Sequence, residues 1–120
     1  MNELILILTT MPADDRAAGV AKTLVEERLA ACVNVHPPML SIYRWQDRVE
    51  TEAERQLVIK TTRGSLAALE ARLRQLHPYE LPEFVVLDAA ASAAYGAWVA
   101  DGSRSGYSRT LPIERASGRR

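Results

Sequence analysis

A short segment between two prolines gathers the groups of this chain that could do chemistry. His77-Pro78-Tyr79-Glu80 is followed by Leu81-Pro82-Glu83, which places an imidazole, a phenol and two carboxylates within seven residues. Proline fixes its own φ and restricts the residue before it, so we expect a stiff loop that holds these groups in place. Such a loop suits a metal ion or a small anion. The alternative is an ordinary helix-to-strand connector whose polar side chains meet water and backbone.

The bulk composition favours a small cytoplasmic domain. The chain has 120 residues, of which 48% are hydrophobic, and 15 basic residues balance 15 acidic ones. A net charge of zero argues against a nucleic-acid partner. A single cysteine, Cys32, excludes an intrachain disulfide and fits a reducing compartment. The apolar run at residues 4–8 is too short for a signal peptide or a membrane span, so we expect no membrane partner.

Hydrophobic periodicity predicts four extended and three helical segments. We expect strands at residues 4–8, at 31–35 continuing through 40–45, at 49–62 and at 84–87. We expect helices from Asp14 to Leu29, over residues 66–76 and after Ser92, with Asp14 and Ser92 as caps. His36-Pro37-Pro38 interrupts the second strand, and Gln46-Asp47-Arg48 turns it into a long hairpin.

This order predicts an α+β fold, the ferredoxin-like split βαβ sandwich (βαββαβ) with an added C-terminal helix. We expect one domain over residues 1–102, and a flexible Gly-, Ser- and Arg-rich tail over residues 103–120. Tyr95 and Trp98 are expected in the core. Two helices cover only one face of such a sheet. The apolar strands leave a second face that needs cover, and self-association is the simplest source.

Five motifs together resemble the CutA family of divalent-cation tolerance proteins. They are Leu29-Ala30-Ala31-Cys32-Val33-Asn34, Ser41-Ile42-Tyr43-Arg44-Trp45, Ile59-Lys60-Thr61, the His77 loop through Glu83, and Tyr95 with Ala97-Trp98. They occur in the family's order and spacing and cover roughly residues 4–98, whereas the tail is not part of the resemblance. The resemblance implies a tight homotrimer whose long hairpins pair across subunits.

The resemblance also implies binding of copper or another divalent cation. The family's proposed copper site uses a cysteine near the end of the first strand and histidines at the end of the second helix. His77 matches one of these histidines, while Thr9 and Leu76 stand at the other positions. Glu80 and Cys32 complete our candidate metal ligands, because carboxylates, imidazoles and thiolates are metal donors. For Cys32, a buried and inert thiol is the alternative.

A second candidate site would lie in a cleft between subunits. Lys60, Tyr79, Trp45 and Glu83, with His77, would form a pocket with a cation and aromatic walls for a small anionic molecule. The alternative is an interface salt bridge from Lys60 with aromatic packing. This site would suit a sensor or adaptor of the PII type, an analogy of fold only.

Two further patterns carry weaker alternatives. Glu50, Glu52 and Glu54 share one face of the third strand, either as a cation-attracting ridge or as a solvated edge that deters aggregation. His77 and Glu80 could form an acid/base pair, but the chain offers no nucleophile or oxyanion hole, so we expect no enzyme. We also expect His77→Ala to weaken copper binding while leaving the melting temperature nearly unchanged.

Overall fold

Five strands form one antiparallel sheet in the computed structural model, which describes residues 3–103. The strands are β1 (Leu4–Pro12), β2 (Cys32–Val35), β3 (Met39–Trp45), β4 (Arg48–Thr62) and β5 (Val85–Asp88). Their order is β2-β4-β1-β5, with β3 paired to the remaining part of β4. This order agrees with the predicted βαββαβ arrangement. The first strand extends to Pro12, beyond the predicted residues 4–8.

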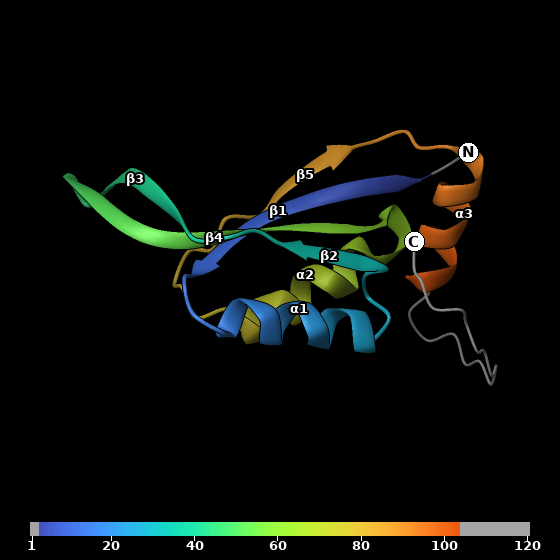
Figure 1. The fold of residues 1–120 in the computed structure, drawn as a ribbon, viewed down its shortest axis with the longest axis horizontal. Coiled ribbons are helices and arrows are strands. Elements are labelled where there is room, and N and C mark those ends of the chain that lie inside the picture. Colours follow the sequence, from blue (N-terminus) through green and yellow to red (C-terminus); the bar gives the residue numbers. More distant parts are fainter. Residues whose placement is uncertain (1–2, 104–120) are drawn as a thin grey trace.

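Two of the three helices lie against the same face of the sheet. These are α1 (Arg16–Glu26) and α2 (Leu66–Leu76), and the 3-10 turn η1 (Arg63–Ser65) precedes α2. The third helix, α3 (Ala93–Gly102), lies at one end of the sheet (Figure 1). The predicted cap of α3 is present, because Ser92 Oγ accepts the Tyr95 N–H at 3.2 Å. The predicted cap of α1 is wrong by one residue: the N-cap is Asp15, which makes no side-chain cap bond, while the Asp14 carboxylate accepts the Arg16 N–H at 3.0 Å.

The core lies between the sheet and these two helices. Alternate residues of β1 and β4 point toward the helices because side chains alternate along a strand. The largest fully buried apolar side chains are Ile5, Ile7, Met11, Leu24, Leu57, Ile59, Leu69, Leu73 and Val99. One hydrophobic cluster therefore contains the leucines at helical spacing on α2 and the aliphatic residues at strand spacing on β1.

The first half of β4 and the whole of β3 form a two-stranded ribbon that projects from the body (Figure 1). Residues 36–38 separate β2 from β3, which confirms the predicted break at the two prolines. Gln46 and Asp47 close the ribbon with φ values of 51° and 67°. Two successive residues with positive φ are the signature of the tight hairpin turn that suits the twist of the flanking strands.

The second face of the sheet carries apolar side chains that no helix of the pair covers. Leu6 lies opposite Leu87, and Leu8 lies opposite both Val85 and Val58. Residues that face each other across neighbouring strands share one side of the sheet. These five residues form what we call the open face. Val85 and Leu87 are each 43% exposed, so the prediction of an uncovered second face is confirmed.

Two expectations about the C-terminal region need correction. Trp98 was expected in the core but is 49% exposed, and Tyr95 is only partly buried. Ser103 was assigned to the tail but is 1% exposed, and its carbonyl accepts the Ser65 hydroxyl at 2.5 Å. The domain therefore includes Ser103, and the rest of the predicted tail lies outside the described residues. Between residues 3 and 103, no helix is long and apolar enough to cross a membrane.

Candidate functional site

His77 forms hydrogen bonds with residues near the end of β1 and with its own loop. Its side chain is buried, with Nε2 at 2.9 Å from the Thr10 carbonyl oxygen and 3.3 Å from Thr9 Oγ1. Its Nδ1 lies 3.2 Å from the Tyr79 backbone nitrogen. A carbonyl can only accept and an N–H can only donate, so Nε2 carries the proton and Nδ1 accepts. Both ring nitrogens are therefore engaged, and the bonds select one neutral tautomer.

The surroundings of His77 keep the imidazole neutral. Burial lowers its pKa below the ordinary value of 6.5, although the Thr10 carbonyl and the charge of Glu54 oppose this shift. A ring with this burial and these bonds stabilises the fold. From this geometry we expect His77→Ala to lower the melting temperature, in place of the nearly unchanged value expected from the sequence, because truncation removes both bonds and opens a buried space.

The lowered pKa of His77 gives a testable pH dependence. Below pH 6.5 the unfolded chain takes up a proton at residue 77 that the folded chain resists, so the free energy of unfolding falls as the pH falls. We expect chemical denaturation between pH 7.5 and 5.5 to show this loss, and His77→Gln to flatten it. His36→Gln is the control, because His36 is exposed. An equal slope in wild type and His77→Gln would contradict this role of His77.

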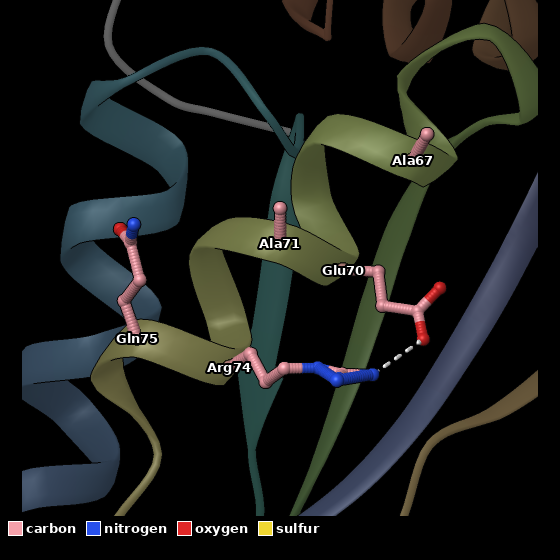
Figure 2. A pocket seen from close by; sticks show the side chains of 5 residues that line it. All are labelled: Ala67, Glu70, Ala71, Arg74 and Gln75. Atoms are coloured by element: carbon pink, nitrogen blue, oxygen red, sulfur yellow. Dashed lines mark hydrogen bonds and ion pairs between the residues drawn. The ribbon is translucent and has the colours of Figure 1, made fainter.

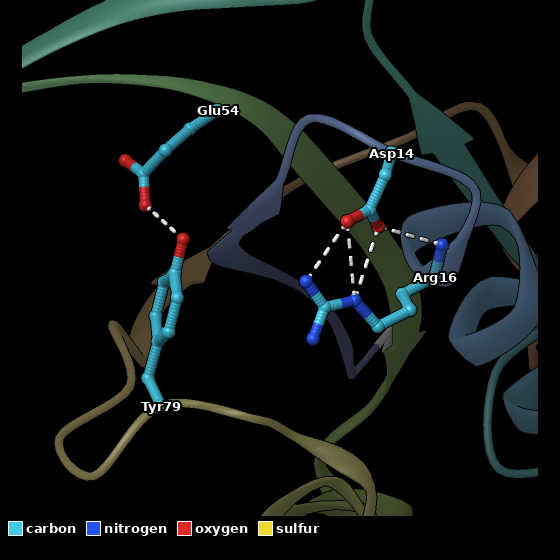
Figure 3. Close-up of polar contacts among 4 residues, drawn as sticks. All are labelled: Asp14, Arg16, Glu54 and Tyr79. Atoms are coloured by element: carbon cyan, nitrogen blue, oxygen red, sulfur yellow. Dashed lines mark hydrogen bonds and ion pairs between the residues drawn. The ribbon is translucent and has the colours of Figure 1, made fainter.

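Tyr79 ties the same loop to the root of the ribbon. Its hydroxyl donates to Glu54 Oε2 at 2.6 Å (Figure 3). Glu54 lies opposite Pro12 of β1 and Met39 of β3, where β4 passes from the body into the ribbon. Burial, followed by the bond to Glu54, raises the pKa of Tyr79 well above its ordinary range. The phenol therefore remains a hydrogen-bond donor at neutral pH.

Glu54 fits neither alternative given for the three glutamates of this strand, because it is buried and not part of an exposed ridge or a solvated edge. Glu52 is exposed and Glu50 is partly exposed, but Glu54 is 7% exposed and accepts a hydrogen bond from Tyr79.

An ion pair joins Asp14 and Arg16 at the start of α1, with 2.8 Å from Asp14 Oδ2 to Arg16 Nη2 (Figure 3). The Arg16 guanidinium, first through its hydrogen bonds, lowers the pKa of Asp14.

Gln56 adds a contact that sequence reasoning did not identify. Its amide nitrogen donates to the Thr9 carbonyl at 2.9 Å and to Glu83 Oε2 at 3.2 Å. Glu54 and Gln56 therefore connect β4 to both ends of the His-Pro loop. Glu54 and Gln56 are two residues apart on one strand, so the sequence indicates that their side chains share a face of the sheet. It does not indicate that the His-Pro loop lies against that face.

The three candidate metal ligands do not converge within one chain. His77 lies beside Thr9, as the resemblance implies for these two positions, but Thr9 offers only a hydroxyl. Cys32 is partly buried and pairs with Lys60 across β2 and β4. Glu80 is exposed on the loop. Across residues 3–103, no group of three or more His, Cys, Asp or Glu side chains is placed to hold a metal ion.

The four cleft residues divide among three places. Tyr79 and Glu83 belong to the His77 neighbourhood. The Lys60 amine lies 5.7 Å from the centre of the Tyr95 ring. Trp45 is 38% exposed at the tip of the ribbon, opposite Arg48. A pocket that uses all four therefore needs residues from more than one chain.

Two surface hollows adjoin α2. One, of about 560 Å³, is a shallow site on the outer face of α2 that contains none of the predicted residues (Figure 2). The other, of about 380 Å³, contains Tyr79 and Glu80. Its other lining residues are Glu70, Leu73, Arg74, Leu81, Pro82 and Phe84. Glu70 and Arg74 form an ion pair of 3.4 Å there, so the hollow has no concentrated charge of one sign.

The sheet and helices define an α+β protein with an antiparallel sheet and three helices. The chain belongs to the CutA1 divalent ion tolerance protein family, whose model matches residues 5–102. The divalent-cation tolerance protein CutA of Thermus thermophilus is 49% identical over 87 residues, which cover 72% of this chain and 82% of that relative.

Solved structures agree with this assignment. The divalent cation tolerance protein (Cut A1) from Thermus thermophilus superposes with a TM-score of 0.80 at 42% identity, over 83% of this chain and 98% of that one. The PII-like protein CutA from Nostoc sp., in its apo form, superposes with a TM-score of 0.79 at 38% identity, over 84% and 98% of the two chains.

Proposed function

We propose that this chain acts as a homotrimer in the tolerance of divalent cations, and that it binds copper or another divalent cation. The observation that carries the cation role is the family match over residues 5–102, together with a Thermus relative that is named for that tolerance. We place its action in the cytoplasm because its single free cysteine, Cys32, suits a reducing compartment.

Two features support the trimer. The open face presents Leu6, Leu8, Val58, Val85 and Leu87 without a covering helix. The ribbon adds further exposed apolar side chains, among them Leu40, Ile42 and Val49 at 64–66% exposure. Apolar surface of this extent is typical of an interface. Partner chains that cover the open face and pair with the ribbon would remove both from water.

His77 supports the cation role through its protonation state. A metal ion needs a lone pair, and a neutral imidazole provides one without competition from a proton. Here the lone pair is on Nδ1, which the Tyr79 N–H occupies at 3.2 Å. A cation at Nδ1 must displace that bond, at a cost of about 1 kcal/mol. The remaining ligands would come from neighbouring carboxylates or from another subunit.

A growth assay tests the cation role in the cell. A strain that lacks its own homologous gene is challenged with copper, and the wild-type chain is compared with His77→Gln at equal expression. We expect wild type to restore growth and His77→Gln to fail, with His36→Gln as the control. Equal rescue by wild type and His77→Gln would remove His77 from the tolerance role.

A second candidate function is binding of a small anion by a PII-like sensor or adaptor. The Nostoc neighbour, which is described as PII-like, and the half-buried cation Lys60 favour it. We propose no catalytic role, because Glu80, the proposed acid/base partner of His77, is exposed on the loop.

A further inference from the structure

The two hollows beside α2 adjoin and form one groove along the outside of that helix. Glu70 and Arg74 line both hollows, so their ion pair lies where the hollows meet (Figure 2). The first hollow contains the exposed alanines Ala67 and Ala71. The second hollow has four apolar lining residues, which are Leu73, Leu81, Pro82 and Phe84. This groove, which we call the α2 groove, therefore runs from the start of α2 to the His-Pro loop.

The chain leaves the described domain at the start of the α2 groove. Ser103 is 1% exposed, and its carbonyl oxygen accepts the Ser65 hydroxyl at 2.5 Å. Ser65 is the N-cap residue of α2, and Ala67 of the first hollow follows two positions later. The 17 residues that follow Ser103 therefore begin beside the groove. They lie beyond the family match, which ends at residue 102.

The composition of residues 104–120 complements the domain in charge and the groove in polarity. These residues include five arginines and one glutamate, a net charge of +4, whereas residues 1–103 include ten basic and fourteen acidic side chains, a net charge of −4. The large apolar side chains are Tyr107, Leu111 and Ile113, and Arg109 stands between the first two. Side chains alternate along an extended chain, so these four would share one side of it.

The length of this segment fits the groove. The 11 residues of α2 make a helix about 16 Å long, and Ala71 lies about 9 Å along it from Ser65. Four residues of extended chain span about 13 Å, so Tyr107 can reach the first hollow from Ser103. The same span separates Tyr107 from Leu111, which is enough to cross from one hollow to the other. The Glu70–Arg74 pair is exposed and contributes little stability, so Glu70 can accept another guanidinium.

We propose that residues 104–113 dock in the α2 groove of their own chain. The Tyr107 ring fills the alanine-lined hollow, and Leu111-Pro112-Ile113 fills the second hollow. Arg109, between them, pairs with Glu70 where the hollows meet. Because α2 covers the face of the sheet opposite to the open face, assembly through the open face leaves this groove accessible. The docking is independent of the cation role at His77.

Methyl NMR of alanine and leucine side chains in the full-length protein tests this placement. An aromatic ring changes the local magnetic field at methyl groups packed against it. Tyr107→Ser should therefore shift the Ala67 methyl signal, and Leu111→Ser should shift the Leu81 methyl signals. Ser108→Ala is the matched control, because position 108 points to the other side of an extended segment, and it should shift neither.

Limited digestion with trypsin measures how fully the groove holds the segment. Trypsin cleaves after arginine, and cleavage after Arg109 requires the undocked segment, so its rate follows the population of the undocked form. Ala71→Trp fills the first hollow, and we expect it to accelerate cleavage after Arg109 about 10-fold. Ala68→Trp is the control, since Ala68 is exposed on the same helix but lines neither hollow.

Three results would overturn the docking. An Ala67 signal that does not respond to Tyr107→Ser would show that the ring is not in the first hollow. Equal cleavage rates in wild type and Ala71→Trp would show that the groove does not protect the segment. Labelled Tyr107→Ser subunits that regain the wild-type Ala67 signal when mixed with unlabelled wild type would place the segment on a neighbouring subunit. None of these measurements uses copper, so failure of the docking is distinguishable from failure of the cation role.

Discussion

Replacing Leu87 by glutamate should convert the assembly into monomers. Leu87 lies on the open face opposite Leu6 and is 43% exposed in the single chain, so the folded subunit has room for a carboxylate there. In a trimer that covers the open face, the same carboxylate would be buried without a partner, at a cost of several kcal/mol for each subunit. Light scattering should therefore change from about 40 kDa, three times the 13.3 kDa chain, to the mass of a monomer.

Leu81→Glu provides a matched control for this experiment. It introduces the same charge at a leucine that is 71% exposed on the His-Pro loop, away from the open face. We expect it to retain the trimer mass. Wild type at monomer mass, or Leu87→Glu at trimer mass with a native circular dichroism spectrum, would contradict assembly through the open face.

Replacing Tyr79 by phenylalanine should destabilise the fold by about 1–3 kcal/mol, because it leaves the Glu54 carboxylate buried without its hydroxyl donor. The loss is measured by urea unfolding at pH 7. Hydrogen exchange should also become faster at the root of the ribbon, around Met39 and Glu54, because the bond joins the loop to that point.

Tyr43→Phe is the control for Tyr79→Phe, because it also removes a tyrosine–glutamate hydrogen bond, but at an exposed position. Tyr43 is exposed on the ribbon, and its hydrogen bond to Glu52 is the main cause that raises its pKa to about 12. An exposed bond of this kind contributes little net stability, so we expect a loss below about 0.5 kcal/mol. Equal losses for Tyr79→Phe and Tyr43→Phe would show that Glu54 is not a buried group in need of its donor.

The order of elements could be predicted from the sequence because each signal is local. Strand and helix periodicities, the Ser92 cap and the break at Pro37-Pro38 all act within a few residues of one another. The uncovered second face followed from counting layers, since two helices cannot cover both sides of a sheet whose strands are apolar on both sides.

The connections of the site could not be predicted, because they depend on strand register. Glu54 meets Tyr79 across 25 positions of the chain, and Gln56 meets Glu83 across 27. Side-chain parity alone places Glu54 on the same face as Glu50 and Glu52, whereas its 7% exposure and its bond to Tyr79 show that it is buried beside the loop. Trp98 was misplaced for a similar reason: apolar residues at helical spacing define a face of α3 but not whether that face meets the sheet.

Calorimetric titration of copper(II) into the purified protein measures directly whether His77 belongs to a cation site. The buffer coordinates copper weakly, and wild type is compared with His77→Gln, whose amide can still donate to the Thr10 carbonyl, and with His36→Gln. We expect saturable binding by wild type and His36→Gln that His77→Gln loses, with all three proteins folded and at equal oligomer mass. Absent saturable binding, or binding equal in wild type and His77→Gln, would contradict a cation site at His77.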